Sequence, residues 1–279
     1  MQPTKKSPIP TNQPHKMNTT QNIHRVALTT IIAIAVCVCP APRARAASFV
    51  GGDDFSSVSG SWGPDNIFGA GSFSVSGGLL NYTTSGAPTA TDGAERYWTL
   101  NTGSYTAAWS VQADLTVGNF ASSQNIFAEF NIENASDSSD VARLGFWGGT
   151  TTRRYYADIL TNGIQTEPSA QPLTSSTNVA LQLSFDPLSK IITFAYDNNA
   201  GVGGYSFTPF FSKAINSAAE NWNMTTSSAF WVKIGIIAYN NQPVTTGQVN
   251  FDNFQAPEPS TITLTAMGLP LLLSRRRLR

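Results

Sequence analysis

The sequence predicts an all-β protein whose body is a single sandwich of two antiparallel sheets. Apolar and polar residues alternate with period 2 through most segments between residues 48 and 255, the pattern of strands with one buried face. Clusters of Gly, Pro, Asn and Asp separate these segments. About 210 residues of short strands are enough for one sandwich of roughly a dozen strands.

Three segments show the alternation most clearly, and each predicts a strand with a defined inner face. Their apolar positions are Tyr105, Ala107, Trp109, Val111, Ala113, Leu115 and Val117; Val179, Leu181, Leu183 and Phe185; and Phe230, Val232, Ile234, Ile236 and Ala238. One short stretch, residues 211–219, has a spacing that fits a helix instead.

Charge is scarce and unevenly distributed. Charged residues make up 12% of the chain, about half of the usual share of roughly 25%. Residues 47–256 contain 16 Asp and Glu but only 7 Lys and Arg, a net charge of −9. An acidic body argues against nucleic-acid binding, which needs basic patches facing the phosphates.

All the cysteines and histidines precede residue 47. They are Cys37, Cys39, His15 and His24. The body therefore lacks the side chains for disulfides, thiolate catalysis, Ser-His-Asp triads and ordinary zinc, copper or haem sites. No cofactor is predicted, except that oxygen ligands leave calcium open.

The first 46 residues follow the pattern of a secretory signal peptide. A basic, polar lead is followed by the 13-residue apolar run from Val26 to Val38, and Ala44-Arg45-Ala46 fits a cleavage site with small residues. The apolar run is shorter than the roughly 20 residues of a membrane span. We therefore expect export, with a body that begins at residue 47.

The last 23 residues combine a Pro-Glu-Pro turn, a short apolar run and a basic end. This order resembles the PEP-CTERM sorting signal of Gram-negative bacteria, and the matching residues are Pro257, Glu258, Pro259, Ser260, Arg275, Arg276 and Arg277. The resemblance implies that an exosortase cuts the tail and passes the body to the cell surface or the exopolysaccharide matrix. Residues 257–279 would then form a sorting tail whose short transmembrane segment anchors the chain only before processing.

Several phrases in residues 47–256 resemble the concanavalin A-like lectin/glucanase superfamily. They are the opening residues 53–56, the segments 72–83 and 183–197, and the closing residues 249–255. The resemblance implies a jelly-roll sandwich and supports the fold more than any activity. The first and last strands of such a sandwich pair as neighbours.

That pairing would bring Asp53 or Asp54 close to Asp252. Three carboxylates at one place are candidate ligands for a structural calcium ion. Alternatively, they cap turns by accepting hydrogen bonds from backbone N–H groups. The sequence leaves both interpretations open.

The segment Ala-Glu-Phe-Asn-Ile-Glu-Asn places Glu129, Asn131 and Glu133 on one strand face, away from the core. Its spacing resembles the Glu-x-Asp-x-Glu strand of laminarinase-type glycoside hydrolases. The resemblance implies that Glu129 is the nucleophile and Glu133 the acid/base. Asn131 departs from that pattern, because the family has an acid there that tunes the nucleophile. The alternative is a polar face exposed to water.

Binding of sugars without cleavage is the third interpretation. The non-core positions on neighbouring segments predict a platform of aromatic and hydrogen-bonding side chains, made of Glu129, Asn131, Arg143, Trp147, Tyr156, Trp231 and Tyr239. The platform requires that these strands share one sheet.

Taken together, these features predict an exported cell-surface or matrix protein. Its body would be a structural or carbohydrate-binding module that is not an enzyme, with extracellular polysaccharide as a partner and no nucleic acid. The alternative is a glycoside hydrolase that uses Glu129 and Glu133.

Overall fold

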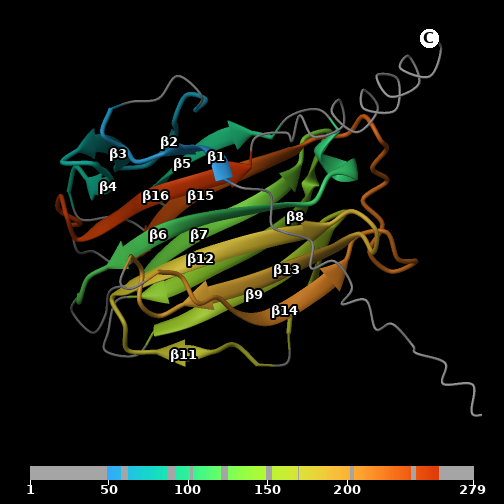
Figure 1. The fold of residues 1–279 in the computed structure, drawn as a ribbon. Helices are drawn as coiled ribbons and strands as arrows, with labels where there is room; N and C mark the ends of the chain where they lie inside the picture. Colours follow the sequence, from blue (N-terminus) through green and yellow to red (C-terminus); the bar gives the residue numbers. More distant parts are fainter. Residues whose placement is uncertain are drawn as a thin grey trace, which may run out of the picture. The chain divides into compact units, whose positions relative to one another are not determined.

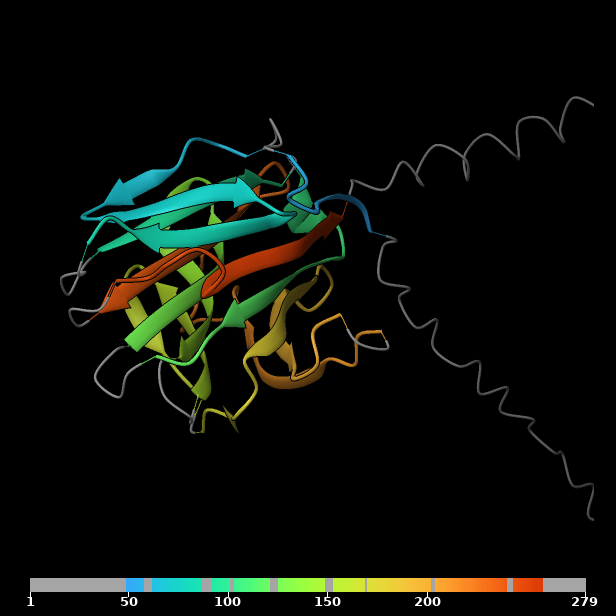
Figure 2. The ribbon, with the colours of Figure 1, turned by 90° about the vertical axis from the view of Figure 1, so that its left-hand side faces the viewer.

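The protein folds as two antiparallel sheets of short strands packed face to face. The computed structural model describes residues 49–57, 62–86, 92–100, 103–120, 125–148, 153–168, 170–201, 204–239 and 243–257. Figures 1 and 2 show the two sheets stacked as layers. The predicted signal peptide, residues 1–46, and all of the predicted sorting tail after Pro257 lie outside the described residues.

The first sheet has eight strands, and β1 (Phe49–Asp53) pairs with its strand β16. The other seven lie in the order β14 (Thr208–Ala214), β13 (Ile191–Asp197), β12 (Asn178–Asp186), β6 (Trp109–Val117), β16 (Val249–Pro257), β4 (Leu79–Thr84) and β3 (Gly71–Ser76).

The second sheet also has eight strands, and β11 (Leu173–Thr174) pairs with its strand β9. The other seven lie in the order β10 (Ile164–Thr166), β9 (Arg153–Thr161), β8 (Asp137–Gly148), β7 (Asn125–Asn134), β15 (Phe230–Tyr239), β5 (Asp92–Thr99) and β2 (Asn66–Phe68). Neighbours far apart in sequence, such as β7 and β15, give the jelly-roll connectivity.

The core lies between the sheets, where the alternating apolar residues of both inner faces meet. Val111, Leu181, Phe130 and Ile234 are all completely buried. Aromatic rings fill one end of the core, and the Trp62 ring lies 4.7 Å from that of Phe254. The expected inner faces are confirmed for the segments from Val179 to Phe185 and from Phe230 to Ala238. The first segment is a strand only from Trp109 onward, because Tyr105 lies in a 3₁₀ turn and the half-buried Ala107 precedes the strand.

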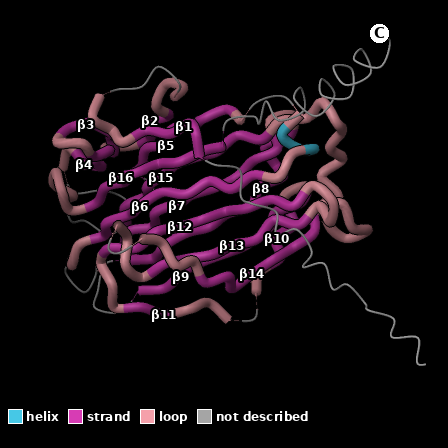
Figure 3. Tube along the Cα trace, in the orientation of Figure 1, coloured by secondary structure: helices cyan, strands magenta, loops and turns pink. Residues whose placement is uncertain are grey.

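Strand dominates the described residues (Figure 3). Within them the one helical segment is a 3₁₀ turn, η1 (Ser104–Thr106), which inserts the Tyr105 ring into the core just before β6 begins. No helix among the described residues is long and apolar enough to cross a membrane.

The helix expected at residues 211–219 is wrong. Residues 208–214 form the edge strand β14, because Thr193 and Phe194 of β13 pair with Ser212 and Phe211 through the antiparallel ladder. The Phe194 and Phe211 rings also lie 5.1 Å apart. Pairing and ring packing at the sheet edge outweigh the weak helical spacing of this segment.

The first and last strands pair as neighbours, as predicted. Gly52 of β1 lies opposite Gln255 of β16, and Asp53 lies opposite Phe254. The ladder between β16 and β6 is interrupted between Asp252 and Gln255. Asn253, within this irregularity, has a φ of 46°, in the left-handed region that Asn tolerates better than most residues.

Candidate functional site

Strand β7 presents three polar side chains on the outward face of the second sheet. Glu129, Asn131 and Glu133 alternate with Phe130 and Ile132, which point into the core. Their exposed fractions are only 6%, 0% and 4%, respectively. The face is therefore covered by neighbouring side chains, unlike the wet surface of the alternative interpretation.

Glycines flank Glu129 on both neighbouring strands. Glu129 pairs with Gly145 of β8 and with Gly235 of β15. The Phe127 ring lies over Gly145, where an added Cβ would come within 2.2 Å of it. At Gly235 an added Cβ would meet nothing closer than 3.4 Å. The sheet surface therefore has room beside Glu129 on its β15 side.

Lys233 of β15 gathers the carboxylates of this face into what we call the Lys233 cluster, which consists of Glu95, Glu129, Glu133 and Lys233. Its Nζ atom lies 3.1 Å from Glu95 Oε1, 3.7 Å from Glu129 Oε2 and 3.0 Å from Glu133 Oε1. The Glu129 and Glu133 oxygens are therefore at most about 6.7 Å apart, the sum of their distances to the ammonium.

Hydrogen bonding distinguishes the two β7 glutamates. Asn131 Nδ2 donates to Glu129 Oε2 over 2.5 Å, whereas Asn131 Oδ1 is buried without a hydrogen-bond partner in the described structure. Burial raises the pKa of the Glu133 carboxyl above its ordinary 4.5, against the opposing effect of the Lys233 ammonium. Burial alone would lower the pKa of Lys233, but the three surrounding carboxylates raise it by more than burial lowers it. The pKa of Lys233 therefore lies above its ordinary value, and the ammonium stays charged.

A second polar group lies beside the cluster on β8 and β9. Arg143 donates from Nε to Asp158 Oδ1 over 2.9 Å and from a terminal nitrogen to Oδ2 over 2.5 Å. Tyr156 and Gln165 also donate to Asp158 Oδ2, at 2.7 Å and 2.6 Å. The bidentate bond to Asp158 raises the pKa of Arg143. Arg143 is therefore committed to Asp158.

Aromatic side chains lie at both ends of the Lys233 cluster along the strand direction. At one end the Trp147 ring stacks on Phe127 at 4.7 Å and on Tyr239 at 5.6 Å. At the other end Trp231 meets Tyr97 edge to face at 6.0 Å. These rings are partly exposed, except for the buried Phe127.

All seven residues predicted for a sugar platform lie on this one face. Glu129 and Asn131 come from β7, Arg143 and Trp147 from β8, Tyr156 from β9, and Trp231 and Tyr239 from β15. Sequence reasoning did not single out Lys233, Glu95 or Asp158. For Lys233 the signal was present, because alternation along residues 229–239 places it on the same face as Trp231.

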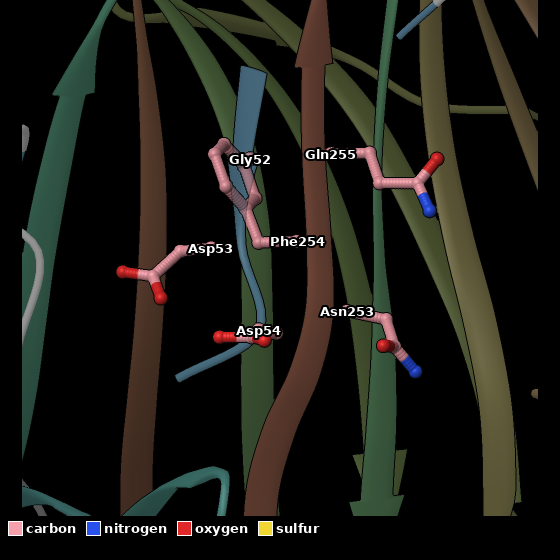
Figure 4. A pocket seen from close by; sticks show the side chains of 6 residues that line it. All are labelled: Gly52, Asp53, Asp54, Asn253, Phe254 and Gln255. Atoms are coloured by element: carbon pink, nitrogen blue, oxygen red, sulfur yellow. The ribbon is translucent and has the colours of Figure 1, made fainter. Parts of the chain in front are cut away.

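The predicted calcium ligands lie on the first sheet, beside a shallow cavity of about 410 Å³ lined by Asp53, Asp54 and Asn253 among others (Figure 4). Asp53 accepts hydrogen bonds from the Phe55 backbone at 2.7 Å and from Trp62 Nε1 at 2.8 Å. Asp54 accepts from the Ser56 backbone at 3.0 Å.

Asp252 accepts from the Asn253 backbone N–H at 2.7 Å, and it lines a different cavity, of about 260 Å³, together with Asp114. Among the described residues, no three His, Cys, Asp or Glu side chains are grouped to hold a metal ion. Calcium binding stays a prediction.

Comparison with known proteins places the fold. No family model and no curated protein matches the chain. Among solved structures, the chain is similar to the CBM2 module of the evolved Dit of Lactobacillus casei BL23 phage J-1. The identity is 14%, the TM-score 0.54, and the match covers 75% of this chain and 94% of that one.

Two further structures match with lower scores. A glycoside hydrolase family 16 endo-glucanase from Bacteroides ovatus has 8% identity and a TM-score of 0.48, with 75% of this chain and 100% of that one covered. The carbohydrate recognition domain of Emp46p has 13% identity and a TM-score of 0.41, with 72% and 89% covered. The body therefore has the fold that the sequence predicted, a jelly-roll sandwich of two antiparallel sheets.

The expectation that the chain is not an enzyme needs correction. Glycoside hydrolases of families 16 and 43 are prominent among the solved structures that resemble it. At identities of 8–14% these likenesses assign no activity to this chain. The fold is nevertheless one that enzymes use, so its all-β architecture gives no ground for excluding catalysis.

Proposed function

We propose that the outward face of the second sheet is a carbohydrate site, and that Glu129 and Glu133 are the carboxylate pair of a glycoside hydrolase. The observation that carries this proposal is that both glutamates form an ion pair with the same ammonium, that of Lys233. Their paired oxygens are therefore at most about 6.7 Å apart. Retaining hydrolysis uses carboxyl groups about 5–5.5 Å apart, whereas inverting hydrolysis uses a separation of about 6.5–9.5 Å.

The roles follow from the environment of each glutamate. Glu129, held by the Asn131 amide, attacks the anomeric carbon while the bond from that carbon to the leaving oxygen breaks. Glu133, whose pKa is raised by burial, gives its proton to the leaving oxygen. Glu133 then removes a proton from water, whose oxygen attacks the anomeric carbon and releases Glu129.

The test is hydrolysis of a panel of β-glucans by the body, residues 47–256. We expect turnover by the wild type, and losses of about 10²-fold or more for Glu129→Gln and for Glu133→Gln. Glu220→Gln, on a carboxylate outside this face that contacts Lys213, is the matched control. Turnover that survives both the Glu129 and the Glu133 substitution would refute the assignment.

Glycan binding by the aromatic ends is a second candidate function, favoured by the Trp147 and Trp231 rings on either side of the glutamates. Trp147→Ala and Trp231→Ala should each weaken binding on a glycan array. Phe207→Ala, an aromatic position outside the second sheet, should leave binding unchanged. Binding that neither tryptophan variant affects would reject this platform.

Export and sorting complete the proposal. We infer that the signal peptide directs secretion, and that an exosortase-type enzyme removes the tail and leaves the sandwich at the cell surface or in the matrix. Replacement of Pro257-Glu258-Pro259 by three alanines should retain the protein in the inner membrane, as measured by fractionation and immunoblotting. Equal release of wild type and variant would contradict sorting through this motif.

A further inference from the structure

Lys233 occupies the centre of the proposed site. In the antiparallel register it lies directly opposite Asn131 on one side and Tyr97 on the other. Its side chain is 12% exposed, and its three ammonium contacts are all to carboxylates. A largely buried ammonium that meets three carboxylates is a strong local source of positive charge.

Asn131 cannot influence the neighbouring glutamates through a charge of its own. Its amide donates to Glu129 but carries no net charge, and its buried Oδ1 has no hydrogen-bond partner in the described structure. In the family that this strand resembles, an acid occupies the middle position, hydrogen-bonds the nucleophile and tunes its ionisation. Asn131 keeps a hydrogen bond to the first glutamate but loses that titratable group.

Lys233 is the one positively charged residue of the Lys233 cluster, and the other positively charged groups on this face lie outside the cluster. The undescribed segments between residues 57 and 243 contain no Asp, Glu, Lys, Arg or His. The charged or titratable groups on the neighbouring strands of this face are Glu95 and Tyr97 of β5, Arg143 of β8, Arg154, Tyr156 and Asp158 of β9, and Tyr239 of β15. The Arg154 guanidinium lies over the Trp147 ring, 5.7 Å from its centre. Arg143 is bound to Asp158 through two hydrogen bonds.

Building on the proposed function, we propose that Lys233 is the positioning residue of the site: its ammonium holds the facing oxygens of Glu129 and Glu133 within about 6.7 Å of each other and sets the charge state of Glu133, in place of an acid at position 131. Without this cation, three largely buried carboxylates would face one another with no positive charge between them. Their repulsion would favour protonation or separation of the side chains.

Glu95 modulates this control. It shares the ammonium with Glu133 at nearly the same distance, 3.1 Å against 3.0 Å. Its charge raises the pKa of Glu133, whereas the Lys233 charge lowers it. Removal of the two charges one at a time should therefore move the Glu133 titration in opposite directions, a result that a packing role for Lys233 does not produce.

The experiment is an NMR titration of the Glu133 side-chain carboxyl in the glycan-free body, followed by pH–rate profiles. In Lys233→Met the Glu133 midpoint should rise by about one to three pH units. In Glu95→Gln it should fall, and Lys233→Arg should stay closer to wild type than Lys233→Met. Lys213→Met, which breaks the separate contact with Glu220, should leave the midpoint unchanged.

Stability against pH gives a second measurement. Lys233→Met should lose most stability near neutral pH and recover part of it in acid, as the carboxylates take up protons. The proposal would be overturned if the titration midpoint of Glu133 in Lys233→Met were unchanged or lower than in the wild type. A loss of stability that does not depend on pH would overturn it too. Shifted titrations with no hydrolysis by any variant would instead refute the hydrolase assignment and leave the role of Lys233 standing.

Discussion

Asp158→Asn tests how the face beside the glutamates is held in place. Asp158 is completely buried, and one of its oxygens accepts from Arg143, Tyr156 and Gln165 at 2.5–2.7 Å. An asparagine keeps the shape but turns one acceptor oxygen into an NH₂ group. That group would face donors, and the Arg143 charge would lose its counter-ion.

The expected loss of stability follows from the burial of each partner. Removal of one partner from a buried ion pair costs about 3–5 kcal/mol. The Arg143 side chain is 29% exposed, so water can partly solvate its charge once the counter-ion is gone. The expected loss in the free energy of unfolding is therefore near the lower end of that range, about 3 kcal/mol. For a domain of this size that loss corresponds to a fall in Tm of roughly 6–12 °C.

The assay is calorimetry or urea unfolding of wild type, Asp158→Asn, Arg143→Met, and the double variant Arg143→Met/Asp158→Leu. The double variant should recover much of the loss, because an apolar pair leaves no charge without a partner. A loss below about 1 kcal/mol in Asp158→Asn would show that the pair behaves as an ordinary surface salt bridge and would refute the reasoning.

Three further predictions concern other parts of the sandwich. Gly145→Ala should cost about 1–3 kcal/mol in urea unfolding, because its Cβ would overlap the Phe127 ring at 2.2 Å; an unchanged midpoint would contradict the close approach. Burial raises the pKa of Asp114 above 3.8, so its contribution to stability is present below that pH and is lost as pH rises through the folded-state pKa. The free energy of unfolding of Asp114→Asn should therefore rise relative to that of the wild type as pH increases. Parallel curves of stability against pH for the two proteins would refute the raised pKa. Lys190→Met should cost about 1 kcal/mol, because Nζ lies 3.9 Å from the centre of the Tyr105 ring, and unaltered thermal unfolding would argue against this contact.

Period-2 alternation predicted the strands and their inner faces because one face of each sheet is buried. It fixes which residues share a face but not which strands are neighbours. Glu129 and Glu133 could therefore be grouped from the sequence, whereas their contact with Lys233 depends on the pairing of β7 with β15, about 100 residues later. The helix prediction for residues 211–219 failed for the same reason, because the local spacing does not reveal that β13 pairs with this segment.

The pairing of β1 with β16 has a mechanical consequence. Phe49 and Pro257 lie opposite each other at the end of an antiparallel ladder, so tension between these two ends would break its hydrogen bonds one after another, like a zipper. Tension carried by β16 alone would instead act along its ladder with β6, where several bonds must fail together. A sandwich tethered at one end would thus withstand drag that a sandwich stretched between both ends would not.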